Sequence, residues 1–272
     1  MYNEYYRLRE NPFNITPDPR FLYLTDQHRE ALNHLLYGIR ERKGFICLTG
    51  EVGTGKTTVC RGLLRELGES YHTALILNPV LTETQILRAI VAEFGVEGKA
   101  RDRLGHLSLL NEFLLKVNSA GQDAVLIIDE AQDMSTSGLE LVRLLSNLET
   151  DRQKLLQICL VGQPELRSKL AKPQLRQLAQ RITVRFHLEK MTPRETEAYL
   201  HHRLQVAAGG QETTVVKFDP GAVREVYRFS RGTPRLVNAI GDKALLAGYV
   251  YRTGRIDRRL VRLAVEELKE AG

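Results

Sequence analysis

The chain has 272 residues, of which 43% are apolar, and it carries a net charge of +6. That length holds one large domain or a large and a small one, and the apolar content is ordinary for a soluble globular protein. Residues 1–10 lack the apolar core of a signal peptide, and no run of about 18 apolar residues predicts a membrane-spanning helix. The mild basic balance permits contact with nucleic acid or an acidic membrane surface, but it does not form a clustered basic arm.

The three cysteines, Cys47, Cys60 and Cys159, are scattered along the chain. An odd number without metal-ligand spacing predicts reduced thiols that are buried as small hydrophobic residues. Such thiols are typical of a cytosolic compartment, so we expect a cytoplasmic protein.

Residues 1–25 form an aromatic and proline-rich segment that includes Pro12, Pro17 and Pro19. Prolines at this density disfavour a helix and predict an extended N-terminal strap that lies on the domain. Apolar residues at helical spacing then predict a helix over residues 26–43.

Strands and helices alternate along the next part of the chain. Continuous apolar runs predict buried strands, and amphipathic runs between them predict helices. The expected strands are residues 45–49, 74–77, 124–129, 155–161 and 182–188, and the expected helices are residues 56–67, 83–94, 107–117 and 138–148. This alternation predicts an α/β nucleotide-binding domain over residues 26–189, with a parallel five-stranded sheet covered by helices on both faces.

After Glu189 no further strand is expected. Helical periodicity resumes, and glycines separate the helical runs. The expected helices are residues 193–207, 220–229, 234–250 and 257–270. An all-α lid domain over residues 190–272 is therefore predicted.

A glycine-rich motif with the spacing G-x-x-x-x-G-K-[ST] follows the first strand and opens the next helix. Its glycines let the backbone curl with N–H groups toward phosphates, and the helix N-terminus adds a field that favours anions. Lys56 is expected to reach the β- and γ-phosphates, and the Thr57 hydroxyl to bind Mg²⁺. The motif consists of Gly50, Glu51, Val52, Gly53, Thr54, Gly55, Lys56 and Thr57.

Two acids end the third strand. Apolar residues 125–128 bury that strand, so Asp129 emerges at its carboxyl end, where ligands bind in open α/β sheets. We expect Asp129 to hold Mg²⁺ through water and Glu130 to orient and polarise the attacking water. The alternative for Glu130 is a surface acid at the start of a loop.

Three further residues are candidates for contacts with the γ-phosphate. Gln163 follows the fourth strand, Arg181 precedes the fifth, and Arg235 opens a lid helix. Phosphoryl transfer needs stabilisation of the negative charge on the phosphate oxygens more than it needs a covalent intermediate. A guanidinium group supplies a positive charge for this purpose, and an amide supplies a hydrogen-bond donor. An ordinary surface role is the alternative for each of the three.

Together these motifs resemble those of AAA+ ATPases, and the resemblance covers nearly the whole chain. The glycine-rich loop, extended by Thr58, resembles Walker A, and residues 126–130 resemble Walker B. The resemblance implies that Gln163 is sensor 1 and that Arg235 is sensor 2. It also implies ATP and Mg²⁺ as cofactors.

The resemblance further implies a homo-oligomer. Arg181 is similar to the arginine finger that reaches the ATP of a neighbouring subunit in this family, with Arg176 and Arg185 as alternatives. Arg235 would couple the angle of the lid to the bound nucleotide, so that hydrolysis is transmitted to the oligomer.

More narrowly, the chain resembles the ExeA (GspA) branch of AAA+ proteins. The similarity rests on short motifs in residues 12–13, 16–21, 37–38 and 160–166. Proteins of this branch are cytoplasmic ATPase modules of bacterial secretion systems, and they often continue into a membrane-spanning helix and a peptidoglycan-binding domain. Neither is expected within this sequence, which suggests a trimmed or a stand-alone ATPase with a secretion-system protein as partner.

The same branch is similar to transposition regulators of the TniB, TnsC and MuB kind, which are oligomeric DNA-binding ATPases. DNA binding is therefore the alternative function, and a basic face of the lid supports it, although such a face is more often simply solvated. A small-molecule kinase is a weaker alternative, because no acceptor motif is present. The basic face consists of Arg252, Arg255, Arg258, Arg259 and Arg262.

The resemblance also suggests a role for the residues before the glycine-rich loop, which border the adenine in AAA+ proteins. Pro12, Phe13 and Tyr37 are expected to line an adenine pocket. The alternative is that they pack the N-terminal strap onto the sheet.

Overall fold

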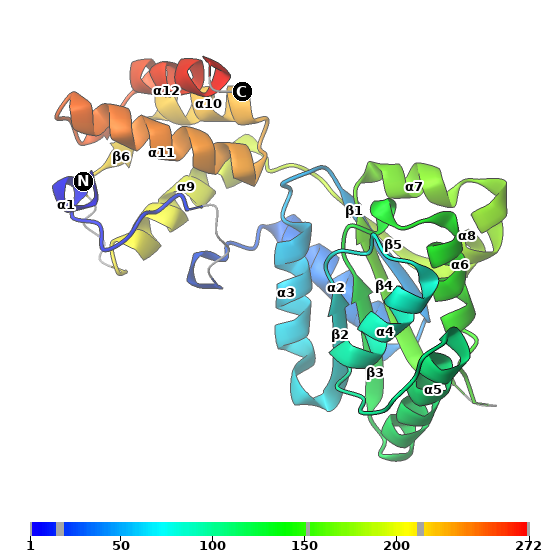
Figure 1. Cartoon of the computed structure of the whole chain (residues 1–272). Coiled ribbons are helices and arrows are strands. Elements are labelled where there is room, and N and C mark those ends of the chain that lie inside the picture. Colours follow the sequence, from blue (N-terminus) through cyan, green and yellow to red (C-terminus); the bar gives the residue numbers. More distant parts are fainter. Residues whose placement is uncertain (1, 15–18, 151–152, 211–214, 271–272) are drawn as a thin grey trace. The chain divides into compact units, whose positions relative to one another are not determined.

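The computed structural model describes residues 2–14, 19–150, 153–210 and 215–270 of the chain, so Pro17 lies outside the described residues. Two compact units are present (Figure 1). The sheet unit consists of Asp26–Glu51 and Lys56–Leu188, and the helical unit consists of Met1–Thr25, Val52–Gly55 and Glu189–Gly272.

The sheet unit is built around five parallel strands in the order β2-β3-β4-β1-β5. The strands are β1 (Phe45–Gly50), β2 (Tyr71–Ile76), β3 (Asp123–Ile128), β4 (Leu156–Gly162) and β5 (Ile182–Leu188). Because β4 lies between β1 and β3, the segments that follow these three strands meet at one edge of the sheet. The predicted five-stranded parallel sheet is confirmed.

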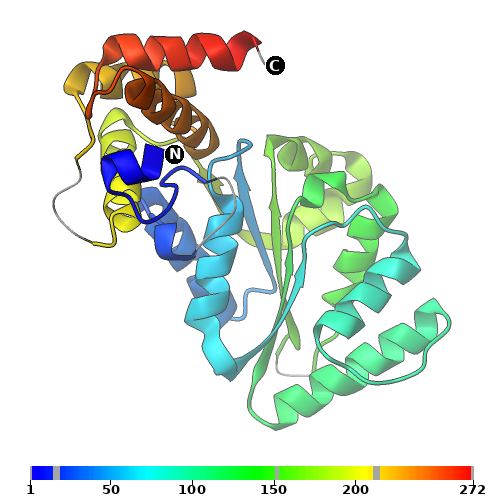
Figure 2. The same cartoon turned by 60° about the vertical axis from the view of Figure 1, so that its left-hand side comes forward.

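Helices cover both faces of this sheet, as Figure 2 shows. Alternate residues of a strand point to opposite faces. Ile46 and Leu48 of β1 pack with α2 and α3, whereas Phe45 and Cys47 belong to the core beneath α4, α5 and α6. The helices are α2 (Asp26–Arg40), α3 (Lys56–Leu67), α4 (Glu83–Glu93), α5 (Arg103–Ser119), α6 (Thr136–Leu145), α7 (Pro164–Leu170) and α8 (Arg176–Arg181).

Some boundaries differ from those expected, because polar residues extend an element or an element is very short. β2 begins earlier than expected, since Tyr71, His72 and Thr73 pair with β3 although they are only half-buried. The sequence does not predict α7 and α8, which are too short to show a clear helical period. Four 3₁₀ turns are also present in the described residues: η1 (Pro19–Phe21), η2 (Gly68–Ser70), η3 (Ala131–Asp133) and η4 (Pro173–Leu175).

The C-terminal part of the helical unit is mainly α-helical, as predicted. Its helices are α9 (Pro193–Ala207), α10 (Pro220–Ser230), α11 (Pro234–Val250) and α12 (Arg258–Glu270). The expectation that no strand follows β5 is wrong in detail, because β6 (Lys217–Phe218) and β7 (Arg255–Ile256) form a short parallel pair. Two-residue strands have no periodicity from which the sequence could predict them.

Residues from the N-terminus complete the core of the helical unit. Within α1 (Tyr2–Tyr6), the Tyr6 side chain is fully buried, and its hydroxyl lies 3.0 Å from the Leu245 carbonyl oxygen and 3.2 Å from that of Thr253. Phe13 is buried in the same core. The described N-terminal residues therefore pack with the C-terminal helices in the core of the helical unit.

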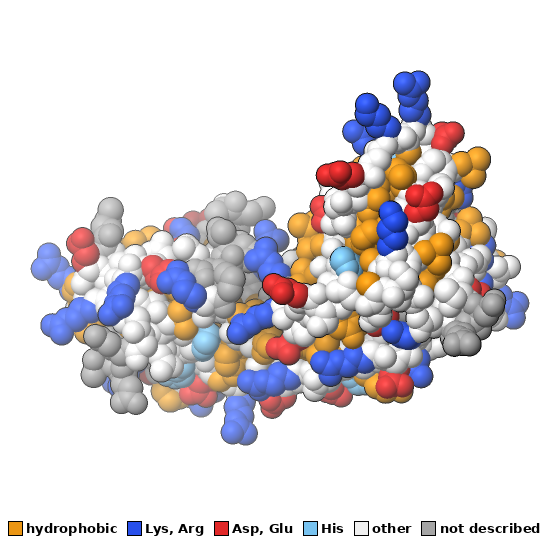
Figure 3. Space-filling model, turned by 90° about the horizontal axis from the view of Figure 1, so that it is seen from below, with side chains coloured by type: hydrophobic (Ala, Val, Ile, Leu, Met, Phe, Trp, Pro, Cys, Tyr) orange, Lys and Arg blue, Asp and Glu red, His pale blue; other side chains and the backbone are white. Residues whose placement is uncertain are grey.

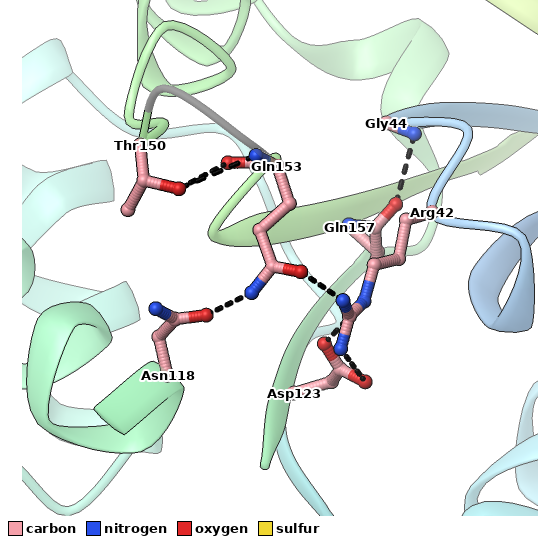
Figure 4. Close-up of polar contacts among 7 residues, drawn as sticks. All are labelled: Arg42, Gly44, Asn118, Asp123, Thr150, Gln153 and Gln157. Atoms are coloured by element: carbon pink, nitrogen blue, oxygen red, sulfur yellow. Dashed lines mark hydrogen bonds and ion pairs between the residues drawn. The ribbon is translucent and has the colours of Figure 1, made fainter. Parts of the chain in front are cut away.

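A polar network holds the amino ends of the strands (Figure 4). The Arg42 guanidinium donates two hydrogen bonds to the Asp123 carboxylate, at 3.0 and 3.2 Å, and a third to Gln153. Gln157, which is 1% exposed, accepts a hydrogen bond from the Gly44 N–H at 2.8 Å. The network ties the turn that enters β1 to the starts of β3 and β4.

Charged side chains are dispersed on the surface seen in Figure 3. On that face, Lys and Arg stand singly among Asp and Glu and do not gather in one large patch. Within the described part of the chain, we find no helix with the length and apolar character required to cross a bilayer.

Candidate active site

The glycine-rich loop connects β1 to α3 at the carboxyl edge of the sheet. Gly50 is the last residue of β1, and Lys56 is the first residue of α3. Gly53 and Gly55 have φ angles of 76° and 101°, which residues with a Cβ atom rarely adopt. The local arrangement is thus a strand, a curled loop and a helix N-terminus, which together form an anion-binding device.

The Lys56 ammonium group lies inside this loop. Its Nζ atom donates to the carbonyl oxygens of Gly50, at 2.9 Å, and Glu51, at 3.0 Å, and the residue is 6% exposed. Burial lowers the pKa of Lys56, and the charges of Glu130 and Asp129 partly oppose that effect. An ammonium group bound to neutral carbonyls can exchange them for phosphate oxygens.

Thr57 and Asp129 meet beside the loop. The Thr57 hydroxyl donates to Oδ2 of Asp129 at 2.7 Å. Asp129 is 2% exposed, and its other carboxylate oxygen accepts a hydrogen bond from the Glu130 N–H at 2.9 Å. The strand order therefore brings together two oxygen-bearing side chains that follow the strands on either side of β4.

Glu130 has a strained backbone and a well-defined carboxylate. Its φ and ψ angles are 51° and 37°, a left-handed conformation that costs a non-glycine residue about 1–2 kcal/mol. Oε2 of Glu130 accepts hydrogen bonds from the side-chain amides of Gln132, at 2.8 Å, and Gln163, at 3.2 Å. Backbone strain of this kind is concentrated at functional sites.

Gln132 belongs to this cluster although the sequence analysis did not single it out. Its Oε1 atom accepts a hydrogen bond from the Gln163 N–H at 3.0 Å while its Nε2 atom contacts Glu130. Its position in the sequence, just after the third predicted strand, could have indicated this contact, since polar residues just beyond neighbouring parallel strands lie at the same end of the sheet.

Arg181 lies at the amino ends of the strands, whereas the glycine-rich loop follows the carboxyl end of β1. It precedes β5, whose first residue is aligned with Phe45 at the start of β1. The length of β1 therefore separates Arg181 from the loop, by about 17 Å at 3.3 Å per residue. Its guanidinium donates to the side-chain oxygens of Ser146, at 2.6 Å, and Asn147, at 2.7 Å.

The two alternatives for an arginine finger are in α8 and β5. Arg176 is exposed at the start of α8, and Arg185 in β5 donates to the Ala179 carbonyl oxygen at 2.5 Å. Arg235 is exposed at the second position of α11 in the helical unit. The roles of these arginines in a nucleotide site remain predictions.

The residues expected around the adenine lie in different environments. Phe13 is 2% exposed and packs edge-to-face on Phe218 with 6.2 Å between ring centroids, and the Pro12 carbonyl oxygen accepts a hydrogen bond from Arg203. These contacts support the packing alternative, although the partners belong to β6 and α9 of the helical unit. Tyr37 lines a hollow beside the start of β5, at the edge away from the loop, which contradicts its assignment to an adenine pocket.

The oxygen ligands at the loop fit Mg²⁺. This ion prefers hard oxygen ligands and is usually bound by one or two protein groups together with waters and phosphates. Thr57 and Asp129 offer such a pair. Among the residues that the structure describes, no group of three or more His, Cys, Asp or Glu side chains forms an all-protein metal site. The pair is therefore suited to an ion that binds together with phosphates.

Comparisons with known proteins agree with this geometry. Residues 39–170 match a family model described as an AAA domain. The chain is 46% identical over 269 residues to General secretion pathway protein A of Aeromonas hydrophila, an alignment that covers 98% of this chain and 48% of that protein. The chain thus spans about half the length of this relative.

Solved structures show the same fold at low sequence identity. The ADP form of the Aeropyrum pernix ORC2 protein matches with a TM-score of 0.69 and 18% identity, over 94% of this chain and 72% of that one. The Thermotoga maritima Holliday junction branch migration motor RuvB matches with a TM-score of 0.59 and 22% identity, over 92% and 73% of the two chains. With the sequence match along nearly its whole length, the chain belongs to the AAA+ proteins, in the branch that contains General secretion pathway protein A.

Proposed function

We propose that the chain binds Mg-ATP at the glycine-rich loop and hydrolyses it as the cytoplasmic ATPase module of a bacterial secretion system. The observation that carries the proposal is the hydrogen bond between Thr57 and Asp129, because it joins the ends of two non-adjacent strands beside the loop. The similarity to General secretion pathway protein A supports the secretion role.

Each residue of the cluster has a defined task in this proposal. The backbone N–H groups of the loop, through Thr58, and the Lys56 ammonium group would bind the phosphates, while Thr57 and Asp129 would hold Mg²⁺. Glu130 would orient a water molecule for attack, and Gln163 would donate a hydrogen bond to that water or to the phosphate. Bound ATP supplies the phosphoryl group, and its Mg²⁺ neutralises charge on the phosphate oxygens.

The direct test is phosphate release from ATP with and without excess EDTA. We expect turnover that depends on Mg²⁺ and saturates with ATP. A pure, folded protein that neither binds a fluorescent ATP analogue nor releases phosphate would contradict the proposal.

We further propose that the active form is a homo-oligomer in which Arg181 acts in the site of a neighbouring subunit. The distance of Arg181 from the loop of its own sheet unit supports this arrangement. The turnover rate per subunit should then rise with protein concentration, and analytical ultracentrifugation should show assembly with a non-hydrolysable ATP analogue. A monomer under all conditions, with a constant rate per subunit, would count against it.

DNA binding remains a second candidate function because of an arginine-lined groove in the helical unit. A hollow of about 730 Å³ is lined by residues of α10, α12 and β7. Glu225, whose side chain is 3% exposed, accepts hydrogen bonds from the Nε atoms of Arg258, at 3.1 Å, and Arg262, at 2.8 Å. The Nη donors of these two guanidinium groups are thus left for phosphate oxygens.

The charge state of Glu225 supports such a groove. Burial alone would raise the pKa of Glu225, but the hydrogen bond from Arg262 and the charges of Arg228 and Arg258 outweigh it and lower that pKa. The carboxylate therefore stays ionised and keeps the arginines in place at neutral pH.

Anisotropy of a labelled DNA duplex distinguishes the two candidate functions. DNA binding predicts an affinity that falls steeply with salt, with a shallower salt dependence in Arg258→Ala/Arg262→Ala. It also predicts that duplex DNA stimulates ATP turnover. No binding and no stimulation at low salt would leave the secretion role as the better candidate.

A further inference from the structure

The contacts of Gln132 define a role for this residue that deepens the proposed ATPase function and rests on it. We propose that Gln132 is the positioning residue of Glu130, holding one carboxylate oxygen so that the other is presented to the attacking water. It acts through Glu130 and does not itself contact the phosphates.

The orientation of the Gln132 amide is determined by its partners. Its Oε1 atom lies 3.0 Å from the Gln163 backbone N–H, which can only donate, so the oxygen end of the amide must face that group. The NH₂ end then faces Glu130, where Nε2 donates to Oε2 at 2.8 Å. Exchanging the two ends of the amide would place an N–H against an N–H and an oxygen against a carboxylate.

The hydrogen bonds to Glu130 are asymmetric. Gln132 and Gln163 both donate to Oε2, and Oε1 accepts no hydrogen bond from the described residues. Two donors on a single oxygen restrict the rotation of the carboxylate, because turning it would break both bonds. Oε1 is therefore the oxygen that remains for a water molecule.

Gln132 is itself supported on several sides. It lies in the turn η3, and the Lys169 ammonium group of α7 donates to its carbonyl oxygen at 2.6 Å and also to the Met134 carbonyl oxygen. Its Nε2 atom is also 3.2 Å from Oδ2 of Asp133. The turn after β3 and the segment after β4 thus hold the amide between them, and the amide in turn holds Glu130.

The most informative variant is Gln132→Glu, which keeps an acceptor for the Gln163 N–H but replaces the donor to Glu130 by a carboxylate oxygen. At neutral pH, kcat should fall about 10²-fold, as expected for a misplaced catalytic group, while KM changes by less than about 2-fold. Gln132→Ala should also lower kcat, by about 10-fold, because the Gln163 amide still contacts Glu130. Wild-type kcat in both variants would overturn the proposal.

The pH profile separates positioning from a general loss of structure. Two carboxylates in contact share a proton, so the pair in Gln132→Glu has one raised apparent pKa. Toward acidic pH, the carboxyl group introduced at position 132 becomes protonated and regains a donor, and kcat relative to the wild type should rise. For Gln132→Ala this ratio should stay flat. The other charged groups around the pair are those of Asp129, Asp133, Lys56 and Lys169.

Thermal unfolding supplies a test that does not depend on turnover. A carboxyl group whose pKa is higher in the folded than in the unfolded state makes the folded protein less stable as pH rises. The loss begins near the pKa of the unfolded state, about 4.3, and is complete above the raised pKa. The Tm of Gln132→Glu should therefore fall by about 2–4 °C relative to the wild type between about pH 5 and pH 8. Gln174→Glu, at an exposed position of η4, should show no such shift. Glu130→Gln/Gln132→Glu should reduce the shift to the part that the neighbouring Asp133 carboxylate causes.

These measurements distinguish a failure of the proposed ATPase function from a failure of the proposed role of Gln132. A wild-type protein without ATP turnover would overturn the proposed function. Parallel Tm profiles for Gln132→Glu and the wild type would overturn the contact between residues 130 and 132, whether or not ATP is hydrolysed.

Discussion

The two edges of the parallel sheet carry polar clusters of opposite kinds. At the amino edge, the Arg42 guanidinium and the Asp123 carboxylate pair through two hydrogen bonds, so each charge is matched by an opposite one (Figure 4). At the carboxyl edge, Lys56 is bound by neutral carbonyls, and Glu130 is bound by neutral amides. At the second edge, the groups hydrogen-bonded to the Lys56 ammonium and to the Glu130 carboxylate are neutral, whereas at the amino edge the two opposite charges bond directly to each other.

Backbone strain does not distinguish the two edges. Arg42 and Glu130 have almost the same left-handed φ angles, 50° and 51°. The Arg42 side chain forms a structural ion pair with Asp123, whereas the Glu130 carboxylate has one oxygen to which no described residue donates a hydrogen bond. The partners of a strained residue are therefore more informative than the strain.

The largest expected effect comes from removing the charge at the carboxyl edge. Lys56→Ala should lose nucleotide affinity and hydrolysis together, because the ammonium group would neutralise the phosphates in both the ground state and the transition state. Titration with a fluorescent ATP analogue and a phosphate-release assay check this. Lys43→Ala, an exposed lysine just before β1, is the matched control and should behave as the wild type.

Glu130→Gln should separate binding from chemistry. The amide keeps the shape of the side chain but removes its basicity, so ATP binding should persist while kcat falls by about 10²–10⁴-fold. Single-turnover phosphate release measures the loss. Normal turnover in this variant would show that Glu130 does not position the water, and Glu149→Gln at an exposed ion pair controls for the change of charge.

The amino edge should respond in stability and not in catalysis. Asp123→Asn weakens the pair with Arg42, in which both side chains are partly exposed, so the free energy of unfolding should drop by about 0.5–1 kcal/mol. Urea denaturation measures this change, and kcat per folded molecule should stay constant. A large loss of kcat would mean that the two edges are coupled; Asp26→Asn, in a highly exposed pair, is the control for stability.

The smallest expected effect is a shift in the pH dependence of ATP binding. Because burial lowers the pKa of Lys56, its charge should be lost with rising pH earlier than the charge of an ordinary lysine, whose pKa is about 10.4. Nucleotide affinity should therefore decline below that pH, and Lys56→Arg should abolish this decline. Circular dichroism over the same range verifies that the protein stays folded, and an unchanged affinity up to about pH 10 would contradict the expectation.

The sequence predicts those parts of the site that depend only on the residues within one short stretch of the chain. The spacing of Gly50, Gly55 and Lys56 implies a loop between a strand and a helix, and the apolar run before Asp129 places that acid at a strand end. The structure contains both features. Their meeting point depends on the strand order, which only the pairing of the strands establishes.

The remaining features depend on contacts between distant residues. The orientation of the Gln132 side chain depends on a hydrogen bond from the N–H of Gln163, which follows a different strand. No pattern within one stretch of sequence predicts such a contact. Tyr37 follows the expected helical pattern, but the direction of α2 carries it to the edge away from the loop. Phe13 is expected at an adenine pocket, with packing on the sheet as the alternative, yet it is buried in a core to which residues from both parts of the helical unit contribute.

That shared core has a consequence for the order in which the protein is made. The Tyr6 hydroxyl donates a hydrogen bond to the Leu245 carbonyl oxygen, so Tyr6 must wait for a residue that lies 239 positions further along the chain. At about 5–20 residues per second, the delay is on the order of 10 s. During translation the sheet unit can fold as soon as it has emerged, while Tyr6 and Phe13 have no helices to pack against until α9, α10 and α11 have emerged.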